Sequence, residues 1–185
     1  SIAAVVSRTH RRPVTDLECS GCMLRPLVPS DADSLAIHAN DREIWLNLRD
    51  LFPHPYTVQH ALAYIAMAAA RPVQTSFGII VDGSAVGNVS LKPGADVERF
   101  SAEIGYWLGR GYWGKGIMTQ AVQAVTRHAF ESIWMHRVFA VPYRRNPASF
   151  RVLEKAGYAL EGFMRRSAVK DGGILDQALY AAYDG

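Results

Sequence analysis

The chain has 185 residues, of which 49% are hydrophobic, and its formal net charge is +3. A chain of this length and hydrophobic content can bury one sizeable core, so we expect a single domain over residues 17–185. Residues 1–16 show no clear periodicity, which predicts a mobile N-terminal extension. No apolar run approaches the ~20 residues that span a membrane, and residues 1–6 lack the basic start of a signal peptide. We therefore expect a cytoplasmic protein without a membrane partner.

Neither the charges nor the cysteines indicate a nucleic-acid or metal ligand. Basic residues cluster only within residues 8–12, whereas a nucleic-acid surface needs a larger basic patch. Cys19 and Cys22 have the spacing of half a zinc site or of a redox pair, but the chain has no second pair of cysteines. We expect both thiols to be reduced, no bound metal and no nucleic-acid partner.

The first half of the chain predicts one strand, two helices and a hairpin. Residues 23–27 form a predicted strand that ends before Pro29, and Ser30 then caps a helix that extends to about residue 40. Residues 41–56 are rich in Trp, Leu, Phe and Pro and predict an irregular or short-helical connection. Thr57 caps a second helix over residues 58–70. Residues 77–81 and 85–91 then alternate as the two strands of a hairpin.

The second half predicts a long central strand over residues 102–108, followed by a glycine-rich turn and an amphipathic helix. Residues 136–141 form the next predicted strand. A further helix has Asn146 as its N-cap, Pro147 in its first position and Gly157 after its end. Residues 158–163 and 174–180 are the closing strands.

The glycine-rich turn predicts an anion site. Its four glycines lie between a strand and a helix, so the turn can adopt positive φ and bring its amides close to a ligand. The helix that follows presents its unpaired first N–H groups and its positive dipole end to the same point. A phosphate-bearing ligand is the expected occupant of a turn built from Gly109, Gly111, Gly114 and Gly116.

This turn, with the helix that begins after Asn146, resembles the GNAT superfamily of acetyl-CoA-dependent N-acetyltransferases, and within it the branch that acetylates ribosomal proteins and other protein N-termini. The resemblance covers residues 17–183 and rests on five patches in the family's order, at residues 24–27, 52–57, 103–116, 146–158 and 161–180. It implies an α/β (α+β) fold with a mixed, mostly antiparallel sheet, splayed near its middle, and helices on both faces.

The resemblance also implies which residues bind acetyl-CoA. The main chain at Trp107 and Leu108, with Asn146, corresponds to the contacts of the pantetheine arm. The amides of the turn and of the first helical turn correspond to the pyrophosphate cradle, at Gly111, Tyr112, Trp113, Gly114, Lys115, Gly116, Met118 and Thr119. The family usually has Arg or Gln where this chain has Gly111, although Arg110 is adjacent.

Two residues are candidates for the chemistry. Glu103 lies within an apolar strand, where a carboxylate is costly unless it is paired or functional. The resemblance implies a general base acting through a water, and the structural alternative is an ion pair with an arginine. The resemblance implies that Ser149 points toward the sulfur. Some members of the family use a tyrosine further along this helix as general acid, and this helix has none before Tyr158, which leaves Ser149 as the candidate proton donor or thiolate stabiliser. A plain first-turn serine is the alternative.

The amine acceptor is expected among aromatic and apolar residues, which could equally belong to the core. The family walls its acceptor site with residues that correspond here to Trp45, Leu48, Arg49, Phe52 and Tyr56. We expect direct transfer of acetyl in a ternary complex, to the α-amino group of a protein first and to a polyamine, antibiotic or amino acid second. A non-catalytic acyl-CoA-binding module is a further alternative. The expected assembly is a monomer or homodimer.

Overall fold

The computed structural model describes residues 16–185, so the predicted N-terminal extension lies outside the described residues except for Asp16. Within that part of the chain, eight strands form one sheet in the order β1-β2-β3-β4-β5-β6-β8-β7. Every neighbouring pair is antiparallel except β5 and β6. The predicted mixed, mostly antiparallel sheet is therefore confirmed.

The strands are β1 (Leu17–Cys19), β2 (Cys22–Arg25), β3 (Ser76–Val81), β4 (Ser84–Pro93), β5 (Ser101–Leu108), β6 (Arg137–Ala140), β7 (Ala159–Lys170) and β8 (Gly173–Tyr183). The helices are α1 (Ala32–Ala39), α2 (Arg42–Trp45), α3 (Val58–Ala69), α4 (Ile117–Glu131) and α5 (Pro147–Lys155). Short 3₁₀ turns cover Pro29–Asp31, Asp96–Glu98 and Arg110–Tyr112.

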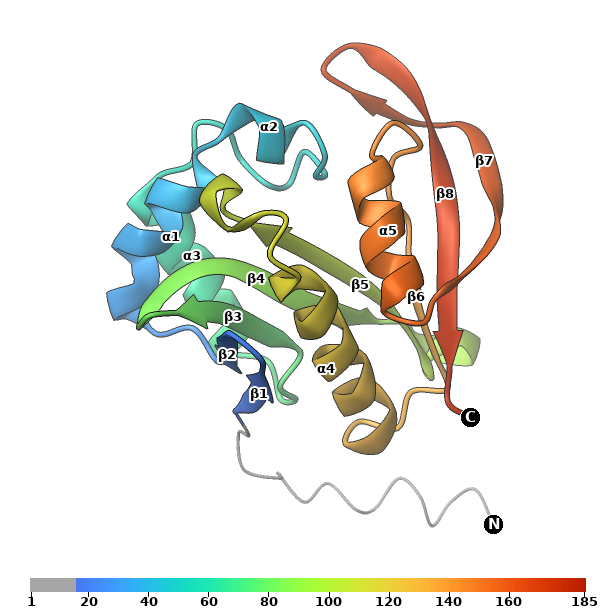
Figure 1. Ribbon diagram of the computed structural model, residues 1–185, viewed down its shortest axis with the longest axis horizontal. Helices are drawn as coiled ribbons and strands as arrows, with labels where there is room; N and C mark the ends of the chain where they lie inside the picture. The colour runs from blue at the N-terminus through green and yellow to red at the C-terminus, as the bar shows by residue number, and fades with distance from the viewer. Residues whose placement is uncertain (1–15) are drawn as a thin grey trace.

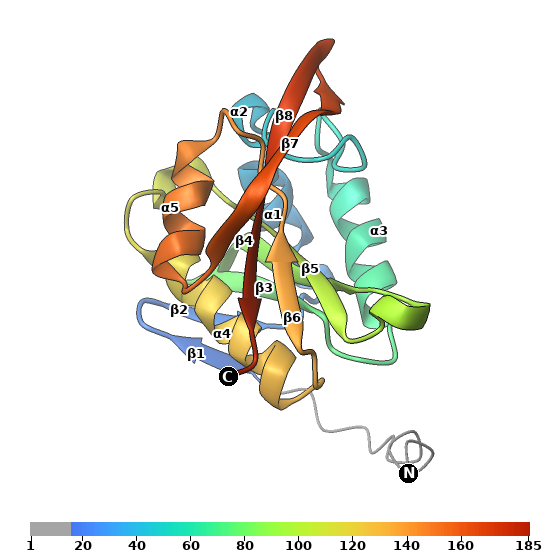
Figure 2. The same cartoon turned by 90° about the vertical axis from the view of Figure 1, so that its right-hand side faces the viewer.

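Helices cover both faces of the sheet (Figures 1 and 2). Helices α1 and α3 pack together on one face, and α4 and α5 pack together on the other. Each face has its own buried cluster of apolar side chains. The α4 side contains Val89, Leu91, Ile104, Val122 and Val125, and the α1 side contains Leu35, Ala39, Ala61, Ile65 and Ile80.

The sheet opens between β5 and β6. Strand β5 pairs with β4 from the Ala102–Pro93 pair to the Leu108–Gly87 pair. Its pairing with β6 stops at the Glu103–Phe139 pair. Residues 104–108 of β5 therefore have no strand partner on that side, and this free edge lies at the splay that the resemblance implies.

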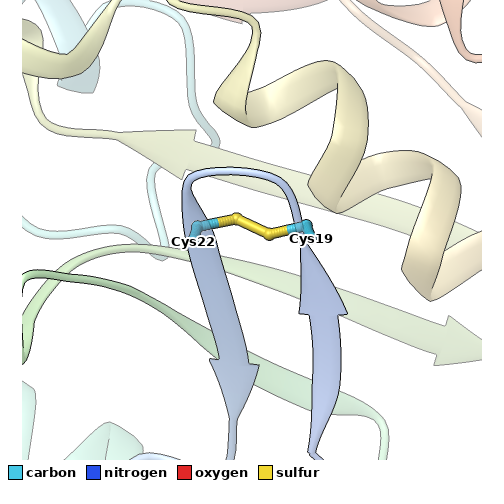
Figure 3. Close-up of a disulfide and its surroundings, with 2 residues drawn as sticks. All are labelled: Cys19 and Cys22. Carbon is cyan, nitrogen blue, oxygen red and sulfur yellow. A yellow bond between two sulfur atoms is a disulfide. The ribbon is translucent and has the colours of Figure 1, made fainter.

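The predicted reduced state of Cys19 and Cys22 is wrong in this structure, which joins them in a disulfide (Figure 3). The sequence did not indicate strand β1, which brings the two cysteines together. Strands β1 and β2 form a hairpin in which the two cysteines are opposite each other, with Cα atoms 5.2 Å apart. Gly21 has φ +80° in the turn, which closes the hairpin tightly enough for the sulfurs to bond.

The start of α1 also differs from the prediction. Asp31, rather than Ser30, precedes the helix, and its side chain is buried instead of capping the helix. Both carboxylate oxygens accept hydrogen bonds from Arg25 of β2, at 2.8 and 2.9 Å. Oδ2 of Asp31 also accepts from the amide of Val28 at 2.8 Å. The carboxylate therefore stabilises this end of the helix through Arg25 and the preceding turn, and not by capping α1 itself.

Candidate active site

Strand β5 separates two halves of the candidate site. Alternate side chains of a strand point to opposite faces of the sheet. Tyr106 packs against the core on the α4 side and contacts α5. Glu103 and Trp107 point to the other face, where they meet the segment 41–56, which we call the acceptor segment. The strand thus places candidate cofactor contacts on one face and candidate acceptor contacts on the other.

The glycine turn forms an open cradle at the start of α4. Gly116 is the N-cap, with φ +77°, and no side chain caps the helix. The first N–H groups of an α-helix have no partner within the helix, so they are available to an anion. A Cβ placed on Gly111, Gly114 or Gly116 would meet nothing within 4 Å. The cradle therefore has the space and the donors that a pyrophosphate group requires.

Two aromatic side chains of the glycine turn make contacts that stabilise its conformation. The indole Nε1 of Trp113 donates to the carbonyl of Leu108 at 2.7 Å. Tyr112 packs edge-on against His38 of α1, with ring centroids 5.5 Å apart, and Lys115 lies over its ring. Tyr112 and Trp113 consequently hold the turn in place, and their predicted cofactor contacts would come from their amides.

The side chain of Arg110 pairs with Asp41 and does not contribute to the cradle. Its guanidinium donates to both carboxylate oxygens of Asp41, at 2.8 and 2.5 Å. This hydrogen bonding from Arg110 lowers the pKa of Asp41. Because Asp41 also caps α2, through the amide of Glu43, the pair attaches the beginning of the acceptor segment to the glycine turn.

Ser149 lies in the first turn of α5 and is held at two atoms. Its amide donates to the side chain of Asn146 at 3.3 Å, which confirms the predicted helix cap. Its Oγ lies 2.6 Å from the hydroxyl of Tyr106. Tyr106 has no predicted role, although strand alternation places it on the face opposite Glu103. Burial raises the pKa of Tyr106 to about 12.

Glu103 is ion-paired with Arg49 of the acceptor segment. The glutamate side chain is 21% exposed, and the arginine side chain is 58% exposed. The hydrogen bond uses Glu103 Oε1, and across residues 16–185 its other oxygen, Oε2, has no hydrogen-bond partner. The structural alternative that the sequence left open is thus present, and it joins the candidate base to a residue of the candidate acceptor wall.

The acceptor segment brings its aromatic side chains to β5. Phe52 contacts Trp107 edge-on, with ring centroids 5.7 Å apart, and lies 4.9 Å from Tyr56. Burial raises the pKa of Tyr56 to about 12. Trp45 stacks on His54, with ring centroids 5.7 Å apart. Of the predicted wall, Arg49 and Phe52 therefore contact β5 directly.

Two neighbouring elements hold the acceptor segment from outside. Between β6 and α5, Arg145 donates to the carbonyl of Leu46 at 2.8 Å, and Tyr143 donates to the carbonyl of Leu48 at 3.3 Å. The predicted wall residue Leu48 thus takes part through its main chain. Further contacts come from the tip of the β7–β8 hairpin, which lies near α2 in Figure 1.

At that tip, Lys170 is the central contact. Its side chain has no exposed surface, and its ammonium donates to Asp50 at 2.8 Å and lies 3.8 Å from the centre of the Trp45 ring. Asp171 pairs with Arg42 at 2.6 Å. The hairpin tip therefore contacts the acceptor segment on both sides of its midpoint.

Neither a membrane helix nor a metal cluster is present in the part of the chain that the structure describes. None of its helices combines the length and apolar character needed to cross a bilayer. No three or more His, Cys, Asp or Glu side chains of residues 16–185 gather where they could hold a metal ion.

Comparisons with known proteins agree with this geometry. A family model described as an acetyltransferase (GNAT) domain matches residues 22–159. Probable N-acetyltransferase YjcK of Bacillus subtilis (strain 168) is 35% identical over 158 residues, covering 82% of this chain and 87% of that protein. The ribosomal-protein-serine acetyltransferase of Escherichia coli (strain K12) is 38% identical over 82 residues, or 44% of this chain and 45% of that protein. Mycobacterium smegmatis RimJ in complex with CoA-disulfide has a TM-score of 0.79 at 25% identity, covering 94% of this chain and 88% of that one.

Proposed function

The chain belongs to the GNAT family of N-acetyltransferases, and on that premise we propose that it acetylates the α-amino group of a protein. The main support is the arrangement around β5. The glycine turn that could hold a phosphate follows the end of the strand, and the aromatic acceptor segment lies on one of its faces. The similarity to a ribosomal-protein-serine acetyltransferase supports a protein acceptor. An aromatic and apolar wall suits a peptide N-terminus whose first residue is small or hydrophobic.

Acetyl-CoA supplies the activated acetyl group of the family's reaction. In this chain the amides from Gly111 to Thr119 would hold its pyrophosphate, because the cradle is open and its donors are uncapped. The end of β5 at Trp107 and Leu108 would hold the pantetheine arm, because this part of the strand has no partner on the β6 side. The carbonyl of Leu108 already accepts from the Trp113 indole, which leaves the Leu108 amide for the ligand. Asn146 lies at the start of α5, on the opposite side of the splay.

The proposed reaction is direct attack of the amine on the thioester. The amine nitrogen bonds to the acetyl carbon, and the carbon–sulfur bond breaks. Glu103 takes a proton from the amine, directly or through a water, by way of the oxygen that Arg49 does not occupy. The departing thiolate accepts a hydrogen bond from Ser149, and the positive end of the α5 dipole stabilises its charge.

Thiol release from acetyl-CoA tests the acceptor class. One panel contains short peptides with varied first residues, spermidine, an aminoglycoside and free amino acids. We expect turnover with peptides. Turnover with small amines alone would replace the protein acceptor with the second candidate, and no turnover with any of them would favour a non-catalytic acyl-CoA-binding module.

The variant Glu103→Gln tests the base. Loss of a general base lowers kcat by about 10²–10⁴-fold, whereas the Kd of acetyl-CoA should stay within about twofold, because Glu103 faces the acceptor side. Arg49→Gln is the comparison variant, because it breaks the same ion pair and keeps the carboxylate; since Arg49 also belongs to the proposed acceptor wall, kcat is compared at saturating amine. Equal losses of kcat in the two variants would show that Glu103 acts only as a partner of Arg49.

A further inference from the structure

The hydroxyl groups of Tyr106 and Ser149 form a close pair between two elements that are distant in the chain. Tyr106 is on β5, in the stretch where β5 no longer pairs with β6, and Ser149 is in the first turn of α5. Their oxygen atoms are 2.6 Å apart. The pair therefore bridges the two elements that line the splay of the sheet.

The direction of this hydrogen bond follows from the surroundings. A buried hydroxyl group needs an acceptor for its hydrogen. Among the described residues, Ser149 Oγ is the single hydrogen-bond partner of the Tyr106 hydroxyl. Burial raises the pKa of Tyr106 to about 12, so the phenol keeps its proton near neutral pH. The geometry allows either oxygen to donate, and the phenol is the more acidic of the two hydroxyl groups, so Tyr106 is the expected donor and the serine oxygen the expected acceptor.

This direction leaves the hydrogen of Ser149 free for another group. A serine hydroxyl has one hydrogen to donate and can accept through its lone pairs. With Tyr106 donating to Oγ and Asn146 holding the amide, the serine is fixed on two sides while its own hydrogen stays unused. Residues 147–155 contain no tyrosine that could act on the sulfur in its place.

We propose that Tyr106 is a positioning residue for the leaving group, acting through Ser149. It donates its hydrogen bond to Ser149 Oγ and so directs the serine hydrogen toward the departing thiolate. Tyr106 keeps its proton throughout, so no proton is transferred along the pair. A relay would be uphill, because a free thiol has a pKa of about 8.5, well below that of the buried phenol. The inference rests on the proposed function, since it presupposes the role of Ser149.

A double-mutant cycle tests this role in thiol release, with acetyl-CoA and the amine that turns over fastest in the panel. One directional hydrogen bond in the transition state corresponds to about tenfold in rate, so Tyr106→Phe should lower kcat about tenfold. The Kd of acetyl-CoA should stay within about twofold. In the Ser149→Ala background, the same tyrosine change should alter kcat by less than about twofold, because Tyr106 acts only through the serine.

Tyr158→Phe is the matched control. Tyr158 is also a buried tyrosine, and its hydroxyl lies 2.6 Å from Oγ1 of Thr126 on α4. The Tyr158→Phe variant loses an equivalent hydrogen bond, but its kcat should be unchanged. An unchanged kcat in Tyr106→Phe would overturn the inference, as would an equal tenfold loss in the Ser149→Ala background, which indicates a structural role. An unchanged kcat in Ser149→Ala alone would overturn the proposed role of the serine itself.

Discussion

The ion pair between Lys170 and Asp50 should respond very differently to the loss of each partner. The lysine side chain is fully buried, whereas the aspartate side chain is 74% exposed. Asp50→Ala leaves a buried ammonium without its counter-charge, and the Trp45 ring is the remaining attractive group 3.8 Å away. Breaking a buried pair in this way costs about 3 kcal/mol.

Lys170→Met should cost much less. It loses the hydrogen bond and the cation–π contact, but it also removes the desolvation penalty of the ammonium, and methionine retains most of the buried apolar stem. The carboxylate left behind is already in contact with water. We expect about 1 kcal/mol for Lys170→Met, and little further loss when Asp50→Ala is added to it.

Urea unfolding at pH 7 measures these differences, and thermal unfolding provides a second reading. A chain of this size changes its Tm by about 2–4 °C per kcal/mol, so Asp50→Ala should lower Tm by about 6–12 °C and Lys170→Met by about 2–4 °C. Equal losses in the two variants, or a larger loss for Lys170→Met, would refute the reasoning. Additive losses in the double variant would show that the two residues act separately.

Two other predictions concern the cradle and the acid stability of the fold. Gly116→Ala and Gly83→Ala each place a Cβ on a residue with positive φ, at +77° and +79°, so each should cost about 1–2 kcal/mol of stability. Titration calorimetry with acetyl-CoA should show weaker binding for Gly116→Ala alone. An equal affinity in both variants would show that the phosphates bind outside the glycine turn. Arg137 hydrogen-bonds Glu161 and, together with Tyr183, lowers the pKa of that carboxyl from 4.5 to about 2. This lowered pKa stabilises the fold above about pH 4.5, and the contribution is lost as the pH falls toward 2. Arg137→Gln should raise the pKa of Glu161 in an NMR titration and flatten the pH dependence of stability in that window; an unchanged titration would contradict this assignment.

The sequence predicted those features that local chemistry determines. Asn146, Pro147 and Gly157 mark the two ends of α5 through local conformational preferences, and this predicted helix is confirmed. The alternation along β5 is also local, so the opposite placement of Glu103 and Tyr106 could be predicted. The glycine turn and its helix were predicted for the same reason.

The features that the sequence did not predict depend on contacts between distant segments. Lys170 and Asp50 are 120 positions apart, and nothing near either residue indicates that the lysine is buried. Strands β7 and β8 extend beyond their predicted ends because they pair with each other across register shifts, including one between Met164 and Ala168. The short β1 exists because β2 pairs with it, which also explains the wrong prediction for the cysteines.

The contacts of Leu46 and Leu48 with Arg145 and Tyr143 have a consequence for how acceptor preference can change. Both leucines are held through their carbonyl oxygens, which every residue type possesses. Their side chains can therefore be exchanged while these two anchors persist. On the proposed role of the acceptor segment, exchange of the Leu48 side chain would change the amine that is recognised while the fold is retained, and this position suits a library that redirects acceptor choice.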